Sequence, residues 1–473
     1  EKALKIEFGF VTELNIYEDI QSNAITGSME IVDTYNLIGN AQLQGNERLS
    51  FILQTPGRGA AGMVATVDAS EETGYPFFIY SITDRRPVSE TTMTYTIYFC
   101  SNELARNTRL RVNRTFDGDL GRMAVKILKD PDGLNTKKPV FFEPTRNQDT
   151  VLMPNLRPFD AVNLIAKKAL SGNANGAGYY FYETAKAYQS TFPRPQIRTL
   201  KYERPTNSGT MTDRKLHTQH HNVQSYEFIN KFDTLANQAL GTYASRVITY
   251  NIFDKSYAIN DYDYHRQYGQ LIHTDTTEEP RTKHNYPIAR NPIDNDPREI
   301  ANTGDKTISD YPESRIILQP STRYLHNENT GVFGTSTDNE GLTEAIRISQ
   351  KNQVHNSTIL KLVIPGLSEM QAGDVIRFDY PRMEPNKGDL AETYYPYDPK
   401  YSGRYLITKL RHRVIEDEYQ MVLECIKDSV YEAQSEVAGE QYYLNPSEPR
   451  GAENLYDKED GLAEVMTDDL GGI

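Results

Sequence analysis

The chain has 473 residues, of which 38% are hydrophobic and 25% are charged, and its net charge is −14. This composition excludes a largely disordered chain, and the lack of any run of about eighteen apolar residues excludes a transmembrane helix. The acidic balance argues against nucleic acid as a tightly bound partner.

Residues 1–112 have the pattern of a β-rich unit. Runs of alternating polar and apolar residues, or of β-branched and aromatic residues, predict strands at 5–10, 28–33, 49–53, 77–82 and 92–99. Pro87 and the Ser-Glu-Thr that follows supply the turn of the last hairpin. No long helical pattern interrupts this segment, so we expect an antiparallel β-barrel or sandwich.

After residue 113 the apolar period becomes helical. Apolar positions at 120–128 and 157–170 predict two helices, the second with Pro158 near its start and Gly172 beyond its end. A hairpin with Tyr179 to Tyr182 on one arm follows. Residues 113–222 are therefore predicted to form a small α/β domain.

The rest of the chain is predicted to form a second, discontinuous β-barrel from 223–265 and 354–430. A helix is expected at 225–240, with Ser225 as its cap and Gly241 as its terminator. Strands at 244–265 are expected to be the first of this barrel, and strands at 360–364, 375–380, 405–410 and 419–426 to complete it. Between them, 266–353 is predicted to be a loop-rich insertion that ends in a short helix at 342–350.

One hairpin sequence occurs twice. Tyr80-x-Ile-Thr precedes Cys100 by twenty residues, and Tyr405-x-Ile-Thr precedes Cys425 by the same number, at an offset of 325. Upstream, residues 43–51 resemble 370–378 at an offset of 327. This self-similarity indicates one β-domain used twice. Such a chain offers twice as many binding positions as it has subunits, which suits a trimer that docks on a six-fold ring.

The two cysteines are 325 residues apart and occupy equivalent points of the two repeats. We therefore expect two buried thiols rather than a disulfide, in a protein that folds in a reducing compartment or is indifferent to one.

No motif predicts catalysis. Residues 57–62 match a dinucleotide fingerprint by letter, but a strand-like run follows where a helix is needed. His217, His220 and His221 could hold a metal only with further ligands, and a solvated loop is the better interpretation. Carboxylate pairs such as Glu71-Glu72 and those at 416–418 cannot be placed across a cleft. We predict no enzyme activity, no catalytic residue, no cofactor and no metal site.

Residues 431–473 form an acidic C-terminal extension, with eleven acidic residues against two basic ones, a net charge of −9. It is interpreted either as a solvated tail or as a docking strand that becomes ordered on a partner. The second interpretation rests on apolar side chains that are candidates for partner contact: Tyr442, Tyr443, Leu444, Leu455 and Tyr456.

Several blocks of sequence, in order, carry a resemblance to a known family. They are Glu-Leu-Asn-Ile-Tyr-Glu-Asp-Ile at 13–20, Asn-x-Ile-Thr-Gly-Ser at 23–28, Met-Pro-Asn-x-x-Pro-Phe-Asp-Ala at 153–161, Ile-Pro-Gly at 364–366 and Gly-x-Tyr-Leu-Ile-Thr at 403–408. Together they resemble the T4-like phage baseplate central hub proteins over roughly residues 1–430.

The resemblance implies a mainly β fold with two related antiparallel β-barrels of tube-like type, a small α/β domain and a loop-rich insertion. It implies a homotrimer with pseudo-six-fold symmetry that adapts a hexameric tail tube to a trimeric spike or tail lysozyme protein, among other baseplate proteins. DNA would pass through its channel without specific binding, and no membrane insertion is expected. The protein would act in the virion baseplate after assembly in the host cytoplasm.

Two alternatives stay open from the sequence. The chain could be a tail-tip hydrolase that degrades the cell wall, or a module of the tail that binds a glycan or receptor through its tyrosine-rich strands. Clearing of peptidoglycan by the isolated protein would favour the first, and glycan binding the second.

Overall fold

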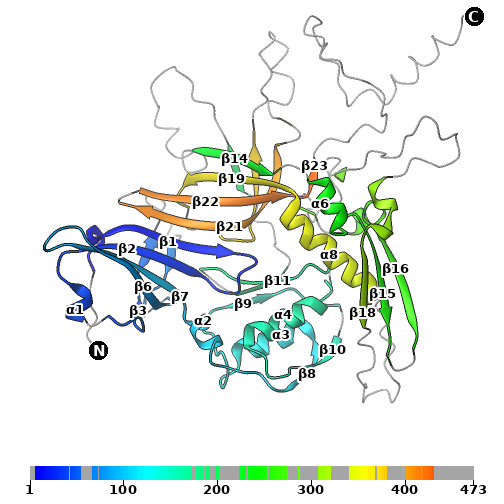
Figure 1. Cartoon of the computed structure of the whole chain (residues 1–473), viewed down its shortest axis with the longest axis horizontal. Helices are drawn as coiled ribbons and strands as arrows, with labels where there is room; N and C mark the ends of the chain where they lie inside the picture. Colours follow the sequence, from blue (N-terminus) through cyan, green and yellow to red (C-terminus); the bar gives the residue numbers. More distant parts are fainter. Residues whose placement is uncertain are drawn as a thin grey trace, which may run out of the picture.

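The computed structural model describes residues 6–41, 43–54, 66–72, 74–146, 148–172, 176–185, 188–191, 198–201, 223–230, 233–252, 255–271, 273–274, 286–287, 307–320, 340–367, 370–380, 398, 401–416 and 418–430. The fold is mainly β, as predicted, with helices and smaller sheets packed around one large, mostly antiparallel sheet of eleven strands (Figure 1). No helix within the described ranges is long and apolar enough to cross a membrane.

The large sheet contains two strand sets with the same order. The first set follows the order β1-β2-β7-β6-β3, and the second follows β14-β19-β22-β21-β20. The first set comprises β1 (Val11–Asp19), β2 (Thr26–Asp33), β3 (Arg48–Leu49), β6 (Phe77–Pro87) and β7 (Met93–Ser101). The second comprises β14 (Ser225–Asn230), β19 (Thr358–Pro365), β20 (Val375–Asp379), β21 (Gly403–Ile415) and β22 (Glu418–Lys427). The duplication inferred from the sequence is thus present as a repeated topology.

The pairing partners show which residues of the two sets correspond. Ile79 lies opposite Phe99 just before a bulge in β6, and Ile407 lies opposite Cys425 just before a bulge in β21. The bulges align at an offset of 328 on β6 and β21, and the partner strands align at 326.

The predicted offset of 325 for this hairpin is therefore wrong, by three residues on one strand and by one on the other. A slip of one residue exchanges the two faces of a strand, and Cys100 corresponds in position to Ile426 rather than to Cys425. Both cysteines are nevertheless buried and free, as predicted. The upstream offset of 327 is confirmed, because Arg48 and Leu49 correspond in their pairing to Val375 and Ile376.

Each strand set has its own apolar core. Ile16, Ile31, Ile97 and Phe99 are buried in the first, and the second buries a similar group around Ile407 and Leu423. The sets join edge to edge, because β1 pairs with β21 over seven residues. In Figure 1 the orange β21 accordingly lies beside the blue strands of the first set.

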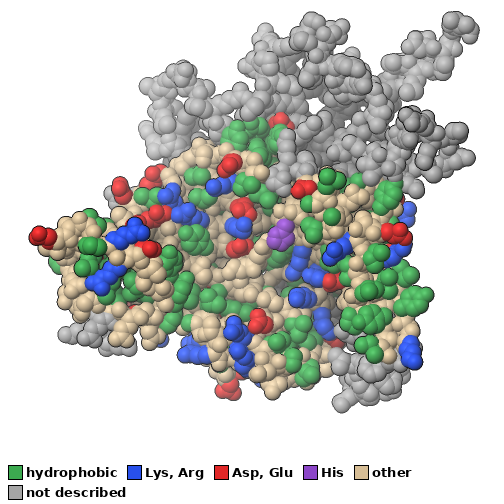
Figure 2. Space-filling view, viewed as in Figure 1, with side chains coloured by type: hydrophobic (Ala, Val, Ile, Leu, Met, Phe, Trp, Pro, Cys, Tyr) green, Lys and Arg blue, Asp and Glu red, His purple; other side chains and the backbone are tan. Residues whose placement is uncertain are grey.

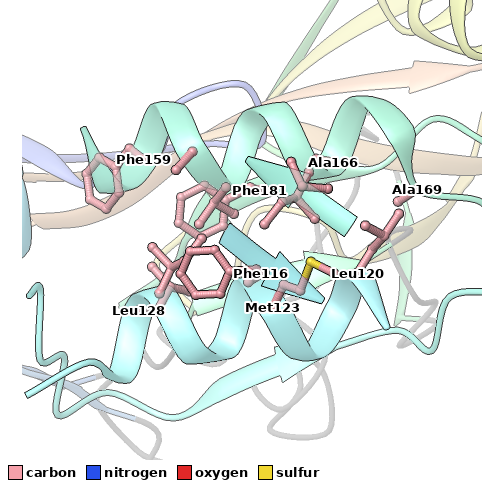
Figure 3. Close-up of a cluster of buried hydrophobic side chains, with 14 of the residues drawn as sticks. Phe116, Leu120, Met123, Leu128, Phe159, Ala166, Ala169 and Phe181 are labelled. Atoms are coloured by element: carbon pink, nitrogen blue, oxygen red, sulfur yellow. The ribbon is translucent and has the colours of Figure 1, made fainter. Parts of the chain in front are cut away.

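The predicted small α/β segment packs below this sheet. It holds β8 (Thr115–Asp119), α3 (Leu120–Lys129), β9 (Val140–Phe142), β10 (Gln148–Leu152), α4 (Pro158–Lys168), β11 (Tyr180–Glu183) and β12 (Tyr188–Thr191), and the short helix α2 (Asn102–Asn107) precedes it, directly after β7. Asp119 caps α3 by accepting a hydrogen bond from the amide of Arg122, at 2.9 Å. The apolar stripes of α3 and α4 face each other and enclose Phe116 and Phe181 from the adjacent strands (Figure 3).

Residues 244–265 do not join the second strand set, contrary to the prediction. They form β15 (Ala244–Tyr250) and β16 (Tyr257–Asp263), which make a separate sheet with β18 (Ile316–Pro320) from the predicted insertion. The helix α8 (Glu340–Asn356) covers one face of this sheet, and Tyr262 donates a hydrogen bond to Ser349 of the helix at 3.0 Å.

The helix predicted at 225–240 is also wrong in its first half. Residues 225–230 are strand β14, and the helix α6 begins only at Thr234 and ends at Ala239, with Asp233 as its cap. Gly241 ends this turn with a φ of +79°, as expected of a terminator. The strand predicted at 5–10 begins only at Val11, after the 3-10 turn η1 (Phe8–Phe10).

The remaining elements are short. They are α1 (Leu37–Ala41), β4 (Ile52–Gln54), β5 (Thr66–Asp68), β13 (Arg198–Lys201), α7 (Tyr264–Gln267), η4 (Tyr268–Gln270), β17 (Tyr286–Pro287), η5 (Ile308–Asp310), η6 (Pro312–Ser314) and β23 (Ser429–Val430). Among them, β13 adds a parallel strand to β20, and β17 pairs with β23.

Candidate functional site

The residues that the sequence considered for chemistry are not brought together. Glu71 and Glu72 lie on an exposed turn, and Glu416 lies at the tip of the β21–β22 hairpin with a φ of +51°. Within the described ranges, no group of three or more His, Cys, Asp or Glu side chains is arranged to hold a metal. The glycines at 57–62, the three clustered histidines and the five partner-contact candidates of the C-terminal extension lie outside the described residues.

Charged and polar side chains of β1 and β21 meet at the joint between the two strand sets. Asn15 of β1 lies opposite Arg413 of β21, and Tyr17 lies opposite Arg411. Glu13 accepts hydrogen bonds from Arg411 at 2.8 Å and from Arg413 at 3.0 Å. Burial alone raises the pKa of Glu13, but the bonds from Arg413 and Asn15 hold the pKa below its usual value. The carboxylate is therefore charged at neutral pH.

The buried carboxylate of Glu18 connects the joint to two neighbouring parts of the chain. Glu18 of β1 accepts the backbone amides of Ala185, at 2.7 Å, and of Ala372, at 2.9 Å. Ala372 precedes the turn into β20, and Ala185 follows β11. One side chain of the first strand set therefore holds the second set and the α/β segment in place.

A second buried contact ties the α/β segment to the first strand set. Lys138 forms an ion pair with Glu183, both almost fully inaccessible to solvent, and Glu183 also accepts the amide of Ile25 at 3.0 Å. Burial lowers the pKa of Lys138, but the neighbouring carboxylate of Glu183 outweighs this and raises the pKa. A buried charge pair of this kind is strongly destabilised when one partner is removed.

The outer edge of β14 and the part of β6 beyond Phe78 correspond to the two edges that meet in the joint. β14 occupies the end of the strand order, where its equivalent β1 is paired on both sides. β6 pairs with β3 only through Phe77 and Phe78, while residues 83–87 are exposed. Among the described residues, no other strand pairs with the outer edge of β14 or of β6 beyond Phe78.

A separate apolar surface lies on the sheet of β15, β16 and β18, on the face opposite α8. Tyr257, Ile259, Ile316 and Leu318 are each more than half exposed there. Figure 2 shows hydrophobic side chains gathered over these strands. A cluster of this kind is typical of surfaces that contact other proteins.

Sequence reasoning did not single out Glu13, Arg411 or Arg413. The spacing of these residues could have indicated a contact. Charged or polar residues at i and i+2 lie on one face of a strand, and they can contact such residues on the neighbouring strand. The spacing did not say which strands are neighbours, and β1 and β21 are almost 400 residues apart.

Comparison with known proteins gives structural neighbours only. No protein-family model matches the chain, and no curated protein matches it. The chain is similar to a tail protein from Neisseria meningitidis, with 11% identity, a TM-score of 0.46 and coverage of 89% of this chain and 93% of that chain. It is similar to a prophage tail protein from Shewanella oneidensis, with 10% identity, a TM-score of 0.43 and coverage of 88% and 94%. A component of the type VI secretion system of E. coli matches with 11% identity, a TM-score of 0.40 and coverage of 90% and 76%.

Proposed function

We propose that the chain is a structural subunit of a contractile phage tail baseplate, a hub whose three copies form a ring of six related strand sets. The observation that carries the proposal is the duplicated strand order together with the edge-to-edge joint of β1 and β21. The sequence blocks that resemble the T4-like central hub proteins support the same role.

The ring would adapt partners of different symmetry. Three chains with two equivalent sets each present six similar positions to a hexameric tail tube and three identical positions to a trimeric spike. The tube, the spike and other baseplate proteins are proposed partners, and DNA would pass through the ring without specific binding. The net charge of −14 suits such a passage, since excess Lys and Arg would retain the DNA.

The five-part division of the chain remains a proposal in this scheme. Residues 1–112 and the second strand set would be the two tube-like units, and the α/β segment, the insertion and the C-terminal extension would serve other contacts. Residues 244–265 belong with the insertion in their pairing rather than with the second tube-like unit.

Electron microscopy of the isolated protein tests the proposal. We expect particles with three-fold symmetry, six lobes around a central opening, and a diameter larger than one chain allows. A field of single chains at every concentration imaged would contradict it. A zymogram on peptidoglycan, run in parallel, is expected to show no clearing.

A further inference from the structure

Among the described residues, two strands pair with the outer edge of β21, whereas one strand pairs with the equivalent edge of β6. Along β21, residues 403–406 pair with β20 and residues 409–415 pair with β1. Along β6, Phe77 and Phe78 pair with β3, which corresponds to β20. The place that β1 takes beside β21 has no described counterpart beside β6.

The strand that corresponds to β1 in the second set is β14. Leu14 lies opposite Met29, and Tyr226 lies opposite Leu362 at the matching position of β19. By the same pairing, Asn15 corresponds to Glu227. The faces agree, because Tyr226 packs against the core of its set as Leu14 does in the first, and Glu227 points away from it.

Residues 409–415 of β21 form the joint with β1. Their equivalents in β6 are found from the residues that lie opposite them on β22 and β7. Arg413 lies opposite Gln420, and Arg86 lies opposite Thr94, so Arg86 corresponds to Arg413. Thr83 corresponds to Arg411 in the same way. Arg86 therefore stands on the face of its strand that carries the joint cations in β21.

If β14 pairs with β6 in the register that β1 uses with β21, two residues of opposite charge lie opposite each other. Asn15 lies opposite Arg413 within the chain, so Glu227 would lie opposite Arg86 between chains. The Arg86 side chain is 78% exposed, and its nearest carboxylate, Asp84, is 4.0 Å away. Glu227 is exposed on the edge strand. Pro87 has no N–H to donate, so the ladder would end there.

We propose that β6 of one copy of this chain pairs antiparallel with β14 of the next copy, in the register that places Arg86 opposite Glu227. This inference rests on the proposed ring and specifies its contact between subunits. Because the two edges differ, the contact is head-to-tail, and repeated around an axis it closes into a ring. The internal joint of β1 and β21 is then the same contact made within a chain.

Cysteine cross-linking of the full chain tests the register. In the double variant Arg86→Cys with Glu227→Cys, oxidation is expected to give a covalent species of three chains in a non-reducing denaturing gel. The matched control is Arg86→Cys with Lys361→Cys, because Lys361 lies opposite Glu227 on the strand behind it, beyond the reach of a disulfide. The control should stay monomeric in the gel.

Charge reversal supplies a second, independent measurement. Arg86→Glu or Glu227→Lys alone should weaken self-association roughly tenfold, since like charges then face each other. The two changes together should restore it. Arg122→Glu, on the exposed face of α3, is the control and should leave the association unchanged.

The outcomes separate the contact from the function. If the unmodified protein is trimeric but the double cysteine variant does not cross-link and the double reversal does not restore association, the proposed strand contact is wrong and the hub role stands. If the unmodified protein never associates, the hub proposal fails, and the contact fails with it.

Discussion

At the scale of single residues, Glu18 is where three parts of the chain meet. It is 1% exposed and lies on β1, yet both of its carboxylate oxygens accept amides from elsewhere, from Ala185 and from Ala372. A buried amide without an acceptor costs about 1–3 kcal/mol, so this side chain stabilises more than its own strand.

Replacement of Glu18 should therefore destabilise the whole molecule. We expect Glu18→Ala to lower the free energy of unfolding by about 3 kcal/mol, because the buried amide of Ala372 and the partly buried amide of Ala185 lose their acceptor. Glu18→Gln should lower it by less, since the amide oxygen can still accept one bond. Glu30→Ala, on the exposed face of β2, is the control and should change the free energy by no more than about 0.5 kcal/mol. Urea denaturation followed by circular dichroism measures all three, and equal effects of Glu18→Ala and Glu30→Ala would contradict the assigned role.

The two thiols give a second residue-scale prediction. Burial raises the pKa of Cys100 to about 12 and also raises the pKa of Cys425 well above its usual range. The thiolate is the reactive form, so neither cysteine should react with a thiol-specific reagent at pH 8 in the folded protein. Two thiols per chain should react after denaturation. Rapid labelling of the native protein would show that one of the cores is open.

At the scale of elements, the equivalence of β14 with β1 determines what each can do. Both carry an apolar residue on alternate positions toward a core, but in the part of the chain that the structure describes β1 is paired on both sides and β14 on one. An edge strand with exposed hydrogen-bonding groups is a template for another strand. Equivalent strands are therefore expected to differ in whether a second chain covers them.

Amide hydrogen exchange at two protein concentrations should reveal this difference. Residues 83–86 of β6 and the strand β14 are expected to exchange at least roughly tenfold more slowly when the protein is concentrated, because a second chain then covers both edges. The amides of β1 and β21 should exchange at the same rate in both samples, since their pairing lies within one chain. Protection that does not change with concentration at 83–86 would argue against the edge contact.

The sequence predicted the elements better than their partners. The structure confirms the elements whose apolar residues recur at a clear strand or helix spacing. These are the strands near 405–410 and 419–426 and the helices near 120–128 and 157–170. The prediction of one helix from Ser225 to Leu240 is wrong in its first half, because Tyr226 and Phe228 alternate like a strand and only the following residues have helical spacing. Pairing with β19 decides the first half in favour of a strand.

The sequence shows that the hairpin is repeated, but the offset that it predicts between the two copies is wrong. Tyr80 and Tyr405 share a motif, yet Tyr80 is a bulge residue and Tyr405 is buried before the bulge of its own strand. β6 has a second bulge, between Thr83 and Arg86, that β21 lacks, and the offset falls from 328 on the first strand of the hairpin to 326 on the second. A gapless alignment cannot represent these changes. The pairs that form the joint were not predictable from either repeat alone.

At the scale of the whole molecule, the duplication would make one chain a third of the proposed ring. Within one chain, β1 already pairs with β21. The proposed pairing of β6 with β14 would repeat the same type of contact between chains. Head-to-tail contacts of this kind either close or continue as a filament, and closure at three copies is what an adaptor to a hexameric tube requires.

The most direct test of the proposed ring is the mass of the protein in solution, measured by sedimentation over a wide range of concentration. One chain has a mass of 53.9 kDa, and we predict a species of three times that mass, with no larger species as the concentration rises. A single chain at the highest soluble concentration, or an open series of ever larger species, would contradict the closed three-chain ring.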